Sequence, residues 1–144
     1  MTTWILVADE SRARLFKVQA KESQLEEIED IVHPEGRMQG REIARDRLPR
    51  TQESVGGARH AIEPHTSVSD KASLEFAREL AERLEHGRVD HAYDELVLVA
   101  APRFLGLLRA TIGHEVSKLL VKSIDKGITQ STPEHIRSVV DAEP

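Results

Sequence analysis

The sequence predicts a three-layer α/β domain with a mixed five-stranded sheet. Two short apolar runs, residues 3–8 and 95–101, are typical of strands buried on both faces. Two further strand patterns follow the first run closely, whereas helical and strand patterns alternate after residue 68. The resulting order, β-β-β-α-β-α-β-α, indicates an antiparallel meander joined to two crossover units, with helices on both faces of the sheet.

The N-terminal strands are separated by polar turn residues. The first strand ends at Asp9-Glu10-Ser11, whose short polar side chains favour a turn. Apolar residues interspersed with basic ones over residues 13–18 predict the second strand. Residues 25–32 fit a third strand, although residues 26–30 also fit a helix.

Residues 34–68 are expected to form one long mobile loop. Glycines and prolines interrupt this segment, which lacks apolar periodicity, and loops of this length are usually functional or disordered. Between Arg37 and His60 there are six arginines, three acidic residues and no lysine, so this stretch carries +3 and the rest of the chain carries -8. Arginine suits bidentate contacts to phosphate, which makes the segment a candidate binding region.

The next helix and strand have clear signals. Ser69 is expected to cap a helix whose apolar side chains recur at helical spacing up to residue 84. Gly87 is expected to end this helix as a C′ glycine, after His86 in the last turn. Residues 95–101 then form a continuous apolar strand.

Proline and glycine organise the remaining C-terminal part. Pro102 is expected at the first position of a helix that Gly113 interrupts before it resumes over residues 114–120. Residues 121–128 are predicted as the last strand. Thr132-Pro133 should begin a terminal helix that runs to residue 140.

Length and composition fit one cytoplasmic domain. The 144 residues suit a single domain over residues 1–140, with residues 141–144 frayed. No apolar run approaches the roughly 20 residues of a membrane-spanning helix, and Met1-Thr2-Thr3 lacks the basic side chains of a secretion signal. The absence of cysteine excludes disulfides and thiolate ligands, and five aromatic residues limit base stacking.

The acidic residues do not predict a metal-dependent nuclease, and we expect neither a metal nor a cofactor. A nuclease site would need carboxylates from the first strand, the first helix and the end of the fourth strand. Asp9 and either Glu75 or Glu79 would fill two of these places, but the fourth strand ends Val99-Ala100-Ala101-Pro102. We therefore interpret Asp9 as a turn residue that accepts backbone hydrogen bonds.

The long segment also contains histidines and a glycine pair. His33 immediately precedes it, and His60 and His65 share it with Glu63; the spacing of these residues matches no metal-ligand motif, so we interpret the histidines as solvated. The stretch from Gly56 to Ala61 is more unusual, because paired glycines let another molecule approach the backbone and Arg59 supplies a fork for phosphate. A flexible loop tip is the simpler alternative.

Four ordered blocks of the sequence are distinctive. They are Trp4-Ile5-Leu6-Val7-Ala8-Asp9 with Arg12-Ala13-Arg14-Leu15-Phe16, Gly57-Ala58-Arg59-His60-Ala61 with Glu63-Pro64, the run from Leu96 to Gly106, and Ile124-Asp125-Lys126 with Thr129 and Pro133-Glu134. In these blocks the chain resembles the host-attachment protein family, bacterial proteins named as required for attachment to host cells.

That family in turn resembles the middle domain of archaeal and eukaryotic peptide release factors, which has a ribonuclease-H-like topology and carries Gly-Gly-Gln on a loop before its long helix. The resemblance matches Gly56 and Gly57 to the two glycines and puts Ala58 in the place of the glutamine. Gly56, Gly57 and Ala58 are therefore the candidate catalytic positions. The candidate RNA- or partner-binding residues are Arg47, Arg50, Gly56, Gly57, Arg59 and His60.

Three functions follow from this resemblance. We expect a non-enzymatic module that associates with RNA, with the ribosome or tRNA as partner, because Ala58 lacks the amide side chain of glutamine. The first alternative is a ribosome-rescue factor that hydrolyses peptidyl-tRNA. The second is a protein-interaction regulator of attachment to host cells or surfaces.

Overall fold

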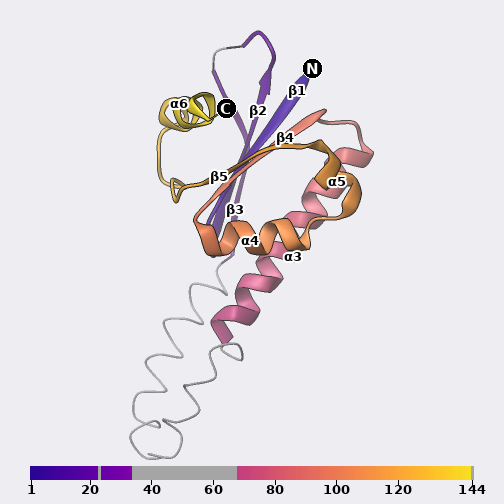
Figure 1. Ribbon diagram of the computed structural model, residues 1–144, viewed down its shortest axis with the longest axis vertical. Helices are drawn as coiled ribbons and strands as arrows, with labels where there is room; N and C mark the ends of the chain where they lie inside the picture. Colours follow the sequence, from indigo (N-terminus) through magenta and orange to yellow (C-terminus); the bar gives the residue numbers. More distant parts are fainter. Residues whose placement is uncertain (23, 34–67, 144) are drawn as a thin grey trace, which may run out of the picture.

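The computed structural model describes residues 1–22, 24–33 and 68–143, which form one open sheet with helices on both sides (Figure 1). The strands are β1 (Thr2–Ala8), β2 (Arg12–Gln19), β3 (Glu26–Val32), β4 (Glu95–Ala100) and β5 (Leu120–Asp125). The helices of the described part are α3 (Val68–Val89), α4 (Pro102–Thr111), α5 (His114–Leu119) and α6 (Pro133–Ala142). No helix in these ranges is long and apolar enough to span a membrane.

The five strands lie in the order β3-β2-β1-β4-β5. β1 pairs antiparallel with β2 and parallel with β4, so that Leu6 lies opposite both Leu15 and Leu98. β2 pairs antiparallel with β3, and β4 pairs parallel with β5. The predicted mixed five-stranded α/β sheet is therefore confirmed, with the two most apolar strands at its centre.

Alternation along the strands produces two hydrophobic cores. On one face of the sheet, every second side chain of the strands, including Trp4 and Leu6 of β1, packs with α3, α4 and α5. On the opposite face, the alternate side chains, including Ile5 and Phe16, pack with Ile136 and Val140 of α6. Figure 1 shows α6 alone on its side of the sheet and the other three helices on the opposite side. The predicted placement of helices on both faces is correct.

Gly87 does not end α3 as predicted. The helix continues to Val89, and a Cβ atom on Gly87 would lie 2.4 Å from Trp4 Cη2. The residue that takes the left-handed conformation is His91, with φ of 57°. Hydrogen bonds from His91 N to Arg88 O and from Ala92 N to Gly87 O, at 3.0 and 2.8 Å, close the helix end. Gly87 is therefore needed for close packing against Trp4 rather than for the turn.

The C-terminal boundaries also differ from the predicted ones. Pro102 and Gly113 begin or interrupt helices as expected, since Gly113 is the N-cap of α5. β5, however, ends at Asp125 instead of residue 128, and Thr129 in the following loop contacts Arg14 of β2 and Asp9 in the turn after β1. α6 continues two residues past Val140, where Arg137 pairs with Asp141 at 3.0 Å.

Candidate functional site

The sequence-predicted site lies outside the described residues. Its members are Arg47, Arg50, Gly56, Gly57, Ala58, Arg59 and His60, all within the range 34–67. The structure describes the two residues that flank this range, His33 after β3 and Val68 at the start of α3. The predicted binding and catalytic roles of the segment therefore remain predictions.

Asp9 has the structural role predicted for it. Its Oδ1 atom accepts hydrogen bonds from the backbone N–H groups of Ser11 and Arg12, both at 2.8 Å. Its Oδ2 atom accepts the hydroxyl of Thr129 at 2.7 Å. Glu75 and Glu79 are exposed on α3, and no group of three or more potential metal ligands occurs among the residues described. The carboxylate of Asp9 therefore holds a turn and a distant loop together.

Arg14 makes a second link between the sheet and the same loop. Its side chain is only 10% exposed and pairs with Glu27 through two hydrogen bonds of 3.0 and 3.2 Å. Its Nη1 atom donates to the carbonyl oxygens of Thr129 and Ser131 at 2.9 and 2.6 Å, and the guanidinium lies over the Phe16 ring. A buried cation needs such partners, and here they fix the loop before α6.

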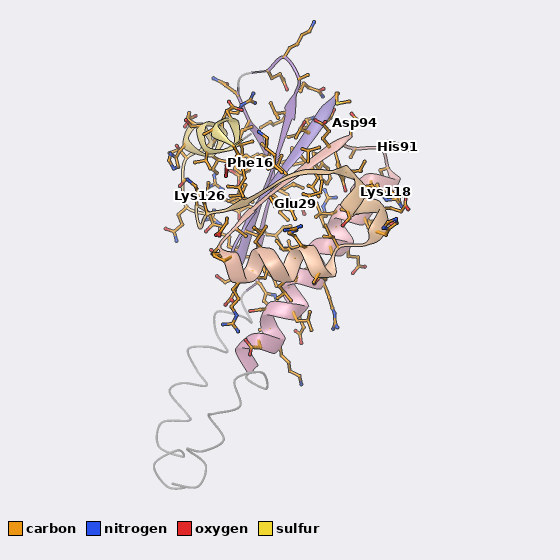
Figure 2. All side chains as sticks on the ribbon, in the orientation of Figure 1. Phe16, Glu29, His91, Asp94, Lys118 and Lys126 are labelled. Carbon is orange, nitrogen blue, oxygen red and sulfur yellow. The ribbon has the colours of Figure 1, made fainter. Side chains whose placement is uncertain are left out.

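The acidic edge strand β3 is neutralised by neighbouring cations. Its acids pair with basic residues of β2 and α3 as follows: Arg12 with Asp30, Arg14 with Glu27, Lys17 with Glu26 and Arg83 with Glu29. Of these residues, Figure 2 labels Glu29. The hydrogen bond from Arg12 lowers the pKa of Asp30 below its ordinary value. The four carboxylates therefore support the sheet and do not form a cation site.

His33 is not solvated, contrary to the prediction. It is 8% exposed and stacks on Phe76 of α3 with ring centroids 4.9 Å apart, and Phe76 stacks in turn on Phe104. Its Nε2 atom is buried without a hydrogen-bond partner in the described part of the chain. The sequence pattern missed this role because the aromatic neighbours lie more than 40 residues away. His33 thus belongs to the core at the border of the undescribed segment.

A cavity of about 540 Å³ lies between α3 and α4. Its lining residues are Glu10, Asp70, Lys71, Ser73, Leu74, Arg103, Phe104, Gly106, Leu107 and Ala110. Glu10 and Arg103 follow the carboxyl ends of the neighbouring strands β1 and β4, where the chain continues from β1 towards the β3 edge of the sheet and from β4 towards the β5 edge. Ligands of open α/β sheets prefer this location. The sequence signal that we missed is the pair of small residues Gly106 and Ala110, which are exposed one turn apart on α4.

Fold and site together define an α/β domain in which Asp9 and the four carboxylates of β3 act as structural partners. The chain belongs to the family described as "Protein required for attachment to host cells", whose sequence model matches residues 4–140. The predicted membership is therefore confirmed. A similar protein is the uncharacterized protein RP470 of Rickettsia prowazekii (strain Madrid E), 32% identical over 83 residues. The matched stretch covers 56% of this chain and 55% of that protein.

Proposed function

We propose that this chain is an RNA- or ribosome-associated binding module of ribonuclease-H-like topology. The observation that carries the proposal is the sheet order β3-β2-β1-β4-β5, with an antiparallel β1-β2-β3 meander and parallel β1, β4 and β5. This arrangement is what the resemblance to the release-factor middle domain leads us to expect. The 22-residue helix α3 also follows the segment that contains Gly56 and Gly57, as the long helix follows the glycine loop in those factors.

Charge segregation supports binding to a polyanion. The +3 charge between Arg37 and His60 contrasts with -8 on the rest of the chain, whose edge strand β3 is acidic but paired. Arginines that neutralise phosphates release counterions, which provides affinity without sequence specificity. We therefore assign RNA contacts to Arg47, Arg50 and Arg59, together with the backbone at Gly56 and Gly57 and with His60.

Chemistry on the bound RNA is not part of the proposal. Ala58 has no amide to orient a water molecule, and Asp9, the carboxylate at the end of β1, is already engaged by the Thr129 hydroxyl and two backbone N–H groups. Binding rather than hydrolysis therefore fits these residues best. Hydrolysis of peptidyl-tRNA is an outcome that the experiment below must distinguish.

The test is cosedimentation of the full chain with ribosomes at two salt concentrations, with sequencing of the bound RNA. We expect binding that weakens steeply with salt, by a log-log slope of about -0.7 for each phosphate contact on a single strand. A triple variant with glutamine at Arg47, Arg50 and Arg59 should bind more weakly and with a flatter slope. The matched control places glutamine at Arg78, Arg109 and Lys126, which are exposed cations of the described part.

Two results would overturn the proposal. The first is wild-type protein that fails to sediment with ribosomes or RNA at either salt concentration. The second is robust release of peptide from peptidyl-tRNA on purified ribosomes that is lost in Gly57→Val, since this would identify the chain as a hydrolase. Equal losses in the two triple variants would assign binding to net charge instead of the arginine segment.

A further inference from the structure

α6 is attached to the sheet by a small apolar contact. Ile136 and Val140 are its buried residues, whereas α3 buries Phe76, Leu80 and Leu84 in the opposite core. Hydrophobic stabilisation follows the apolar area removed from water, so it is smaller for α6 than for α3. The sheet face beneath α6 is formed by apolar side chains of four strands: Ile5, Val7, Phe16, Val18, Val97, Val99 and Ile124.

A cavity weakens this contact further. It has a volume of about 220 Å³ and lies between α6 and strands β1, β2, β4 and β5. Val140 lines it from the helix, and Ile5, Val18 and Val97 line it from the sheet. Side chains that border a cavity lose the packing contacts that a filled interior would give them. The C-terminal half of α6 therefore lies on the sheet without filling the space beneath it.

Polar contacts tie both ends of the segment that contains α6. In the loop before the helix, the buried hydroxyl of Thr129 donates to Asp9 at 2.7 Å, and Arg14 donates to two carbonyl oxygens. Near the end of the helix, Lys122 Nζ donates to the carbonyl oxygen of Val140 at 2.8 Å. These bonds join the segment to β2, to β5 and to the turn after β1. They must therefore break if the segment leaves the sheet.

We infer that residues 129–142, which we call the α6 unit, open from the sheet as one unit while the rest of the described chain stays folded. The core beneath α3, α4 and α5 remains intact in the open state, because the sheet separates the two cores. Proteins open in such cooperative units at a lower free energy than global unfolding requires. The α6 unit is thus a two-state device that covers or uncovers the apolar face around Val97, and it does not depend on RNA binding.

Single cysteines test this opening, since the chain has no cysteine of its own. The measurement is the rate at which dithionitrobenzoate modifies each cysteine in the native protein, divided by the rate for the same variant unfolded in urea. Val140→Cys probes the helix and Val97→Cys the sheet face beneath it. Leu98→Cys probes the opposite core from the next residue of β4.

We expect Val140→Cys and Val97→Cys to react at one common relative rate, roughly tenfold or more above that of Leu98→Cys, because Leu98 is exposed only by global unfolding. Low urea concentrations should accelerate the reaction of Leu98→Cys more steeply, since this slope follows the surface exposed. The larger volume lost in Leu98→Cys speeds its own reaction and so works against the expected difference.

A second substitution tests whether the loop belongs to the unit. Thr129→Val removes the hydroxyl that is bonded to Asp9. It should accelerate the reaction of Val140→Cys and Val97→Cys roughly tenfold or more, the effect of losing one hydrogen bond to a charged group. The matched control is Thr111→Val, because this hydroxyl bonds within α4, outside the α6 unit, and it should leave both rates unchanged.

Three results would overturn the inference. Equal relative rates at all three cysteines would show that α6 leaves the sheet only when the whole protein unfolds. A fast reaction of Val140→Cys with Val97→Cys as slow as Leu98→Cys would mean that only the end of the helix frays. Rates that do not respond to Thr129→Val, or that respond equally to Thr111→Val, would exclude the loop from the opening unit.

Discussion

Trp4 and Gly87 illustrate how one contact constrains two distant residues. Trp4 is 3% exposed, stacks on Tyr93 with ring centroids 4.5 Å apart, and lies under the Arg83 guanidinium. Gly87 lies close against the same indole, so α3 can approach the sheet only where a side chain is missing. The helix carries a residue of low helix propensity at this point because the packing requires it.

Gly87→Ala should therefore destabilise the protein. The new methyl group would lie 2.4 and 2.5 Å from two carbons of the indole of Trp4. Overpacking of this kind costs about 1–3 kcal/mol, which exceeds the gain of about 1 kcal/mol in helix propensity. Urea unfolding measures whether the substitution lowers the free energy of unfolding. Gly106→Ala is the control and should raise stability, because a Cβ atom at this position meets nothing within 4 Å. An equal gain in stability in both variants would contradict the packing role of Gly87.

Tyr93 should titrate at unusually high pH. Burial raises the pKa of this phenol to about 12, while the hydroxyl donates to the carbonyl of Leu84 at 2.7 Å. Because the folded state favours the protonated form, this contribution to stability is complete below the unfolded pKa of about 10 and is lost as the pH rises towards 12.

Tyrosinate absorbance measures this titration directly, because Tyr93 is the only tyrosine of the chain. The native protein should show a midpoint well above that of the protein unfolded in urea. Coincident midpoints in the two states would show that the phenol is not buried. Tyr93→Phe should remove this part of the alkaline loss of stability.

At the scale of the elements, capping differs between α4 and α6. Thr132 caps α6 by accepting the backbone N–H of His135 at 3.1 Å, as the sequence predicts. α4 begins after Ala101, whose side chain cannot cap, although Pro102 provides a suitable first residue. α6 is the one described helix on its face of the sheet, so its cap also affects the core beneath it.

Removing the cap of α6 should lower stability, and adding a cap to α4 should raise it. Thr132→Ala removes an accepted hydrogen bond and should cost about 1 kcal/mol, whereas Ala101→Ser adds an acceptor and should gain about 0.5–1 kcal/mol. Equilibrium denaturation of both variants provides the measurement. A loss in Ala101→Ser would mean that the extended backbone at residue 101 does not permit the cap.

At the scale of the whole molecule, two side chains connect segments more than 100 residues apart. Asp9 bonds to Thr129, and Arg14 bonds to the carbonyls of Thr129 and Ser131. These contacts attach the loop before α6 to β2 and to the turn after β1, on the face that α6 covers. The position of α6 thus depends on polar contacts as well as on Ile136 and Val140.

Arg14 should contribute much more than its neighbour Arg12 to the free energy of folding. Removing a buried, paired cation leaves Glu27 and two carbonyls without their donor and costs on the order of 3 kcal/mol, whereas an exposed pair contributes about 0–1 kcal/mol. Arg14 is 10% exposed and Arg12 is 32% exposed at the side chain. Double-mutant cycles for Arg14 with Glu27 and for Arg12 with Asp30 should show the larger coupling in the first pair. Equal coupling energies would contradict the structural role of Arg14.

The sequence by itself determined the number and order of the strands along the chain, the helix starts at Pro102 and Pro133, and the turn role of Asp9, because these depend on local patterns and on side chains a few residues apart. Only the tertiary structure decided the packing role of Gly87, the burial of His33, the partners of Arg14 and the cavity at Gly106. Each of these depends on contacts between residues far apart in the chain. The periodicity of apolar residues indicates which face of a helix or strand is apolar, but it does not indicate which distant side chain will pack against that face.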